Sequence, residues 1–177
     1  QMPTPQMPAS MPLCFAAPEP ATLALHVLGP EDVQPWAATR PGPEAAFLAA
    51  TGFGGKIGEA TLLPGADGRP VAAVAGYGTP EARARARFVL AAAAARLPAG
   101  SYRLAGPACP EGPALQTEAL GWLLAAYRFE RYKAQAPMGA RLVAPEGLNA
   151  ARVEALAAAE ALTRDLINTP AADMGPE

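Results

Sequence analysis

The stretch "EATLLPGADGRPVAAVAG" (residues 59–76) decides how the strands of this protein pair. It contains two apolar runs, "EATLLP" and "VAAVAG", that are typical of β-strands. The segment "GADGR" between them carries Asp67-Gly68, a dipeptide that favours the tight turn of a hairpin. The two runs are therefore predicted to form an antiparallel strand pair.

The segment "TPEARARARFVLAAAAARL" (residues 79–97) predicts one helix directly after this hairpin. Thr79 suits the N-cap, Pro80 the first helical position and Glu81 the positive end of the helix dipole. Four apolar residues are expected to point inward: Val89, Leu90, Ala93 and Leu97. The arginines between them suggest either phosphate binding or a solvated face, and we favour the solvated face because exposed arginines are common on helices.

Strands and helices alternate on both sides of these elements. Further strands are expected within residues 21–28, 101–106 and 140–145, and further helices within residues 42–53, 113–133 and 149–168. The helix at 113–133 carries the apolar stripe Leu115, Ala119, Trp122, Ala126 and Phe129. The last helix is capped by Asn149 and carries Val153, Leu156, Ala159, Thr163 and Leu166 on one face. This alternation predicts an α/β fold, with a mixed sheet and helices on both faces.

Length and charge limit the possible functions. The 177 residues suit one domain, or one domain plus a fragment. A formal net charge of -2 gives no global field that would attract nucleic acid or an anionic membrane. No stretch approaches the roughly 20 apolar residues of a membrane helix. Residues 1–20 are rich in proline and lack lysine and arginine, so we expect a disordered tail and not a signal peptide.

No motif in the chain carries a recognisable catalytic chemistry. In "TGFGGKIGE" (residues 51–59), Ile57 stands where both a Walker loop and a dinucleotide loop need another residue type. His26, the only histidine, is interpreted as a structural residue of a strand. Cys14 and Cys109 lack the CxxC spacing of a zinc site and are expected to be free thiols in a reducing cytoplasm. We therefore assign no catalytic, cofactor-binding or metal-ligating residue to this chain.

One stretch near the end of the helix expected over residues 113–133 combines aromatic and basic residues. Its members are Trp122, Tyr127, Arg128, Phe129, Arg131, Tyr132 and Lys133. Such interleaving suggests stacking on nucleic-acid bases, but core aromatics at helical spacing are the interpretation that we favour.

Two stretches resemble one known family. "GWLLAAYRFERYK" resembles the M17 leucyl aminopeptidases (cytosol aminopeptidases), in which a buried helix runs into a Tyr-x-Phe-x-x-Tyr-Lys ending. "EALTRDLINTPAADMGPE" is similar to the junction between the two domains of that family. The matching residues there are Asp165, Leu166, Asn168, Thr169, Pro170, Asp173, Pro176 and Glu177. Thr163 and Gly175 depart from the family pattern, which usually has alanine and threonine at these places.

The resemblance implies a fold and a division of the chain. Members of the family have an N-terminal α/β domain similar to the macro fold, a long helix, and a C-terminal domain that binds two divalent metals such as Zn or Mn. We accordingly expect a three-layer, macro-domain-like mixed sheet over residues 21–148. Residues 149–177 would form the interdomain helix and the first residues of the catalytic domain. The acidic motif that carries the metal ligands is absent from these 177 residues, so the chain alone is expected to be inactive and to bind no cofactor.

Three functions follow as expectations. The first is a non-catalytic domain of a bacterial, cytoplasmic aminopeptidase, whose partners are its own catalytic domain and the other subunits of a homo-hexamer. The role implied by the resemblance is hexamer assembly and control of access to the active sites. The second is a separate module for ADP-ribose or another nucleotide, bound through "TGFGGKIGE" and "GYGTPE". The third, nucleic-acid binding, is disfavoured by the near-neutral charge.

Overall fold

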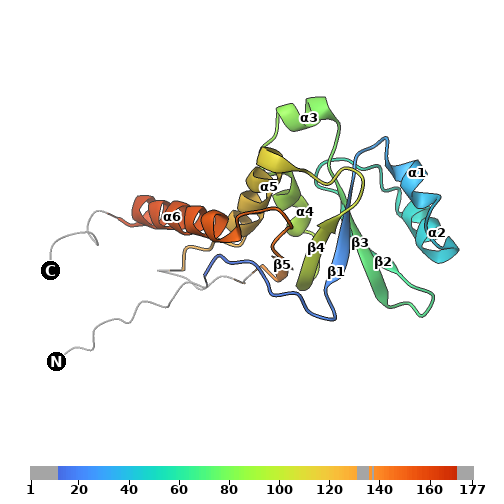
Figure 1. Ribbon diagram of the computed structural model, residues 1–177, viewed down its shortest axis with the longest axis horizontal. Helices are drawn as coiled ribbons and strands as arrows, with labels where there is room; N and C mark the ends of the chain where they lie inside the picture. Colours follow the sequence, from blue (N-terminus) through green and yellow to red (C-terminus); the bar gives the residue numbers. More distant parts are fainter. Residues whose placement is uncertain (1–11, 131–135, 137, 171–177) are drawn as a thin grey trace.

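The predicted hairpin forms one edge of a mixed sheet (Figure 1). The computed structural model describes residues 12–130, 136 and 138–170. Within these residues five strands lie in the order β2-β3-β1-β4-β5, where only β2 and β3 pair antiparallel. The strands are β1 (Leu23–Leu28), β2 (Ala60–Pro64), β3 (Pro70–Gly76), β4 (Gly100–Ala105) and β5 (Ala140–Leu142). The predicted mixed sheet is confirmed.

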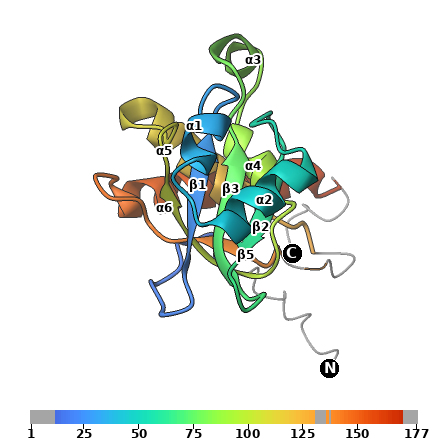
Figure 2. The ribbon, with the colours of Figure 1, turned by 90° about the vertical axis from the view of Figure 1, so that its right-hand side faces the viewer.

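Helices cover both faces of this sheet, so the predicted three layers are also confirmed (Figures 1 and 2). On one face lie α1 (Val33–Ala37) and α2 (Gly42–Thr51). On the other lie α4 (Val89–Ala94), α5 (Gly112–Ala125) and α6 (Ala150–Asn168). The short helix α3 (Pro80–Ala84) stands above the edge of the sheet where the parallel strands end.

The core has two halves, one on each face of the sheet, because successive side chains of a strand point to opposite faces. In β3, Ala73 and Ala75 pack toward α4 and α5, whereas Ala72 and Val74 pack toward α1 and α2. Trp122 of α5 is buried in the larger half, and its indole N–H donates to the carbonyl of Ala140 at 3.2 Å. The sheet is therefore fixed from both sides.

The predicted helix ends are confirmed at three places. The Thr79 hydroxyl accepts a hydrogen bond from the Ala82 amide, which caps α3. The Asn149 side chain accepts one from the Arg152 amide and caps α6. Gly52 ends α2 in the left-handed region with φ 68°, a conformation that favours glycine.

The single helix predicted over residues 79–97 is wrong, because the structure has two helices there. Phe88 separates α3 from α4 with a left-handed φ of 57°. A Cβ added at Gly121 of α5 would lie 2.5 Å from the Phe88 ring, so only glycine leaves room for that ring. The buried carboxylate of Glu118 accepts a hydrogen bond from the Leu90 amide at 2.8 Å and so caps α4. Contacts with α5 therefore override the local helix preference.

The helix predicted over residues 113–133 is also too long. Helix α5 ends at Ala125, and Phe129 of the predicted stripe lies beyond it. The Arg128 guanidinium donates to the carbonyl oxygens of Ala125 and Tyr127, both at 2.8 Å, which satisfies carbonyls that the next turn would otherwise have bonded. Arg131, Tyr132 and Lys133 lie outside the described residues.

The N-terminal segment corrects the expectation of a disordered tail over residues 1–20. Ala16 is buried and forms a parallel bridge with Val143, and its amide donates to Leu142 at 2.8 Å. The segment covers the outer edge of β5, where backbone groups would otherwise be unpaired. The expectation is wrong for residues 12–20, and residues 1–11 lie outside the described part of the chain.

Helix α1 and the last residues of the chain complete the comparison with the sequence-based expectations. Helix α1 was not predicted, since its five residues include Pro35 and follow a turn in which Asp32 accepts from the Gly29 amide. Asp173, Pro176 and Glu177, which match the junction of the family, lie outside the described residues.

Gly76 provides the first test of this packing. A Cβ at Gly76 would overlap the carbonyl oxygen of Lys56, a backbone atom. We expect Gly76→Ala to lower the free energy of unfolding by about 2–4 kcal/mol, because the backbone must move. Gly42→Ala is the matched control, since nothing lies within 4 Å of its added Cβ. Denaturant unfolding measures both, and equal stability of the two variants would contradict the close approach.

Candidate functional site

The loops that follow β1, β3 and β4 are the first place to look for a site. In open α/β sheets, ligands bind beyond the carboxyl ends of the parallel strands. Here these ends carry Gly29, Gly76 and Gly106, and residues 52–59 lie beside them. The two loops named for the nucleotide-binding alternative, "TGFGGKIGE" and "GYGTPE", both lie at these strand ends, and we call them the loop cluster.

The loop "TGFGGKIGE" is closed by its own glutamate. The Glu59 carboxylate accepts hydrogen bonds from the amides of Gly54 and Lys56, each at 2.9 Å. These are the amide groups that would have to face a phosphate. A Cβ at Gly55 would lie 2.7 Å from the Gly29 backbone, so the loop rests directly on the end of β1. The chain itself therefore fills the anion-binding position.

The loop "GYGTPE" is tied to the same cluster. The Gly78 amide donates to the carbonyl of Gly55 at 2.8 Å. Arg83 lies with its guanidinium 4.4 Å from the centre of the Tyr77 ring and donates to the Gly78 carbonyl at 2.6 Å. Arg83 is thus a structural residue, whereas Arg85 and Arg87 are exposed as the solvated-face interpretation expects.

Glu118 of α5 is a buried acid whose charge acts on Tyr77. Burial raises the pKa of its carboxyl, opposed by the hydrogen bonds from the Leu90 and Val89 amides and by the nearby Arg83 charge. No local pattern predicts this role, because a glutamate inside a predicted helix is usually solvated.

His26 contributes to packing on the other face. Its ring lies 4.8 Å from the Trp36 ring of α1, and Arg40 lies over Trp36 at 4.9 Å. Burial and the Arg40 charge lower the pKa of His26, while Glu44 raises it. Arg40 and the buried Glu44 form an ion pair at 2.7 Å, so the charges beside the imidazole are already paired.

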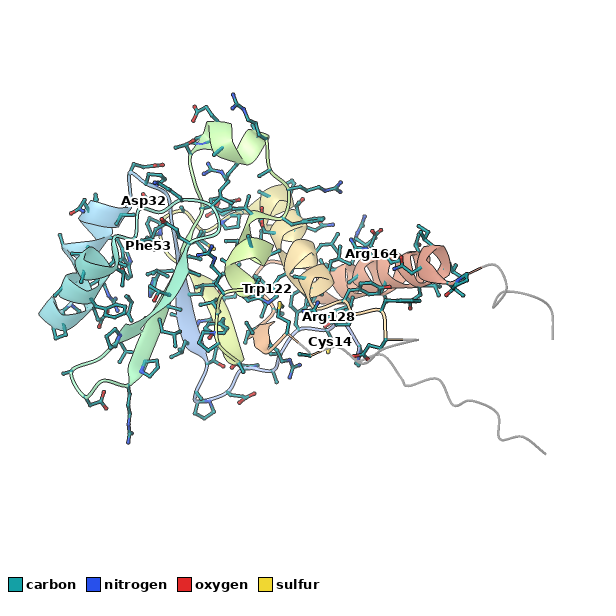
Figure 3. The ribbon with its side chains drawn as sticks, turned by 180° about the vertical axis from the view of Figure 1, so that it is seen from behind. Cys14, Asp32, Phe53, Trp122, Arg128 and Arg164 are labelled. Atoms are coloured by element: carbon teal, nitrogen blue, oxygen red, sulfur yellow. The ribbon has the colours of Figure 1, made fainter. Side chains whose placement is uncertain are left out.

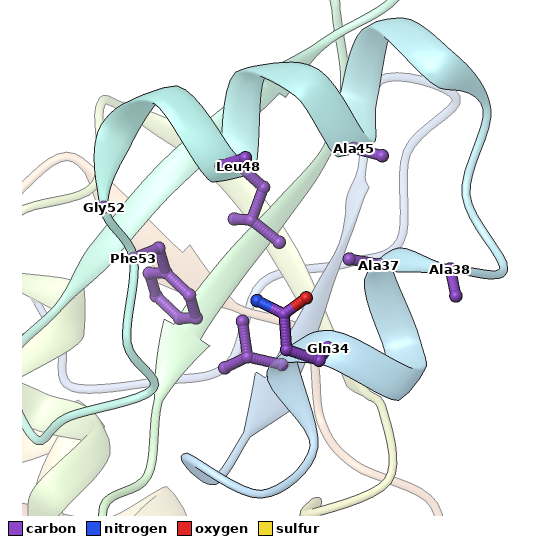
Figure 4. Close-up of a pocket in the computed structure, with 9 residues that line it drawn as sticks. Gln34, Ala37, Ala38, Ala45, Leu48, Gly52 and Phe53 are labelled. Carbon is purple, nitrogen blue, oxygen red and sulfur yellow. The ribbon is translucent and has the colours of Figure 1, made fainter.

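An apolar groove of about 440 Å³ lies between α1 and α2 (Figure 4). Val33, Leu48 and Phe53 are among its lining residues, and the Gln34 side chain points into the space between the two helices (Figure 4). No charged side chain lines it, and specific small-molecule sites usually have several convergent polar groups.

Helix α6 presents the most exposed apolar surface of the described chain. It projects away from the sheet (Figure 1), and Figure 3 shows Arg164 on the projecting helix, well separated from Asp32 and Phe53. Leu156, Leu162, Leu166 and Ile167 are 40%, 61%, 55% and 77% exposed. Of the face predicted from the sequence only Val153 is buried, and Ala157 joins it against α5. The largest apolar residues of this helix are therefore exposed, and only Val153 and Ala157 are buried.

The described residues hold no group of three or more His, Cys, Asp or Glu side chains that could bind a metal ion. Both cysteines are free thiols, as expected. No helix in the described ranges is long and apolar enough to cross a membrane.

Comparison with known proteins gives a consistent result. The family profile described as "M17 aminopeptidase, N-terminal domain" matches residues 23–145. A probable cytosol aminopeptidase of Leifsonia xyli is 35% identical over 148 residues, covering 75% of this chain and 29% of that protein. The chain therefore spans less than a third of the length of this curated relative.

Solved structures show the same partial coverage. The cytosol aminopeptidase of Coxiella burnetii matches with a TM-score of 0.80 and 24% identity, over 93% of this chain and 35% of that one. The bottromycin maturation enzyme BotP matches with a TM-score of 0.59 and 26% identity, over 88% of this chain and 34% of that one.

The buried Glu118 predicts a pH dependence of stability. Because its pKa is raised above 4.5 in the folded state, the folded protein holds this proton more tightly than the unfolded chain. The protonated Glu118 carboxyl therefore stabilises the folded protein fully at a pH below its pKa in the unfolded chain. This contribution is lost as the pH rises through its pKa in the folded protein. We expect wild type to lose stability relative to Glu118→Gln as the pH rises from 4 to 7, measured by denaturant unfolding. Glu160→Gln, at an exposed site, is the control, and a difference independent of pH would contradict the assignment.

Proposed function

Because this chain belongs to the M17 aminopeptidase family as its N-terminal domain, we propose that it is the non-catalytic assembly domain of a longer, metal-dependent aminopeptidase. The longer protein would release N-terminal amino acids from peptides. In this proposal the domain helps to build a homo-hexamer and limits access to the active sites. The cytosol aminopeptidase name of the Leifsonia relative supports a cytoplasmic location.

The exposed apolar face of α6 is the observation that carries the proposal. Leucine and isoleucine side chains gathered on one projecting helix are typical of a surface that another protein segment covers. The helix ends close to the residues that resemble the interdomain junction of the family. The proposed partner of this face is the catalytic domain of the same protein.

The side chains of the described residues do not fit the two metal ions that the family resemblance implies for the longer protein. Such a centre needs several carboxylates close together, and the described residues offer no such group. The acids that are buried or half-buried already serve other groups, as Glu59 and Glu118 do for backbone amides. We therefore derive no catalytic step from this chain and propose that it is inactive alone.

A deletion tests this proposal. The longer protein is prepared with and without residues 1–148, and its mass is measured by light scattering together with hydrolysis of a leucine anilide. We expect the deletion to give smaller assemblies, because one set of subunit contacts is lost. Leu162→Gln is expected to weaken assembly in the same direction, with Ala158→Gln as the matched surface control. An unchanged number of subunits per assembly, together with unchanged activity, after the deletion would contradict the assembly role.

The nucleotide-binding alternative has a separate test. Calorimetry with ADP-ribose is expected to give no micromolar binding, because Glu59 already holds the loop amides. Glu59→Gln serves as the comparison, since it removes the negative charge that would repel a phosphate. Clear micromolar binding to the wild-type chain would overturn the preference for an assembly domain.

A further inference from the structure

The buried apolar residues of α6 lie near its beginning, and the next buried residue is Thr169, directly after its end. Val153 and Ala157 are buried against α5, whereas Leu162, Leu166 and Ile167 are exposed. From Val153 to Asp165 the helix rises about 18 Å at 1.5 Å per residue. A tilt of about 10° at its base would therefore move its far end by roughly 3 Å. The direction of the helix needs a second fixed point.

A hydrogen bond provides that second point. The Tyr127 hydroxyl, just after α5, donates to the Asp165 carboxylate at 2.6 Å. The Arg164 guanidinium lies 5.6 Å from the centre of the same tyrosine ring. The Thr169 hydroxyl donates to the Asp165 carbonyl at 2.7 Å, which fixes the end of the helix around this residue. Both stretches that resemble the M17 family thus meet at one side-chain contact.

A matching hydrogen bond lies near the base of α6. The Glu154 carboxylate accepts from the Phe15 amide at 2.9 Å. The next residue of that segment, Ala16, is itself bonded to β5. Glu154 and Asp165 are eleven residues apart, which is close to three turns, so both carboxylates lie on the same side of the helix.

We propose that the Phe15–Glu154 and Tyr127–Asp165 hydrogen bonds form a two-point clamp that sets the direction of α6 and so positions the protein segment that follows it. The clamp rests on the proposed function, since that following segment is taken to be the catalytic domain. Tyrosine suits the outer point, because its rigid ring loses little entropy and carries one polar atom at its tip. Asp165 and Glu154 act as positioning residues with no part in chemistry.

Amide hydrogen exchange on the full 177-residue chain tests the clamp. We expect Tyr127→Phe and Asp165→Ala each to speed exchange at residues 162–166 about fivefold, as loss of one hydrogen bond implies. The double variant is expected to be no faster than Tyr127→Phe, because Asp165→Ala removes one of the two hydrogen bonds of the tyrosine hydroxyl and Tyr127→Phe removes both, the second being to Asn168. Asp165→Asn keeps a carbonyl acceptor for the tyrosine and is expected to stay near the wild-type rate.

Tyr102→Phe is the matched control, since its hydroxyl donates to the Pro98 carbonyl at 2.8 Å, far from α6. Equal effects of Tyr102→Phe and Tyr127→Phe at residues 162–166, or additive effects in the double variant, would overturn the clamp.

The longer protein separates the clamp from the proposed function. Its assembly is compared after Tyr127→Phe and after removal of residues 1–148. If the deletion changes assembly and Tyr127→Phe leaves it unchanged, the positioning role is overturned while the assembly domain stands. If the deletion itself has no effect, the proposed function fails, and with it the role of the clamp. Altered assembly in both supports the clamp.

Discussion

The fold depends on a close approach of backbone at the carboxyl edge of the sheet. The loop at Gly55 and Lys56 rests directly on the ends of β1 and β3, because Gly55 and Gly76 have no side chain that would separate the backbones. This contact joins the hairpin to the central strands and fills the place where an open α/β sheet usually binds a ligand. Because the chain's own loop closes that place, the apolar surface that a partner could contact lies mainly on helix α6.

Acidic side chains in this chain act mainly as acceptors for its own groups. Glu59 and Glu118 bond backbone amides, and Glu44 is paired with Arg40. A buried carboxylate without a partner would be costly, so these bonds explain how a domain of small apolar residues tolerates buried acids. The same bonds leave these carboxylates committed to the fold and unsuited to binding metal ions.

Helix α6 buries two apolar residues and exposes its largest ones. Val153 and Ala157 are small enough to let the helix lie close to α5, while the larger Leu162 and Ile167 remain exposed. A helix that was simply part of the core would bury its largest apolar residues. This arrangement connects the packing of the domain to the proposal that α6 faces a second one.

The sequence by itself determined the elements whose signals are local. The Asp67-Gly68 turn, the Thr79 and Asn149 caps and the alternation of strands with helices sufficed to predict the mixed, three-layer sheet. Only the tertiary structure decided where neighbouring elements overrule local preference. Phe88 breaks a helix because Gly121 makes room for its ring, and the outward face of α6 follows from what packs against Val153. Such contacts join residues far apart in the chain, so no local pattern carries them.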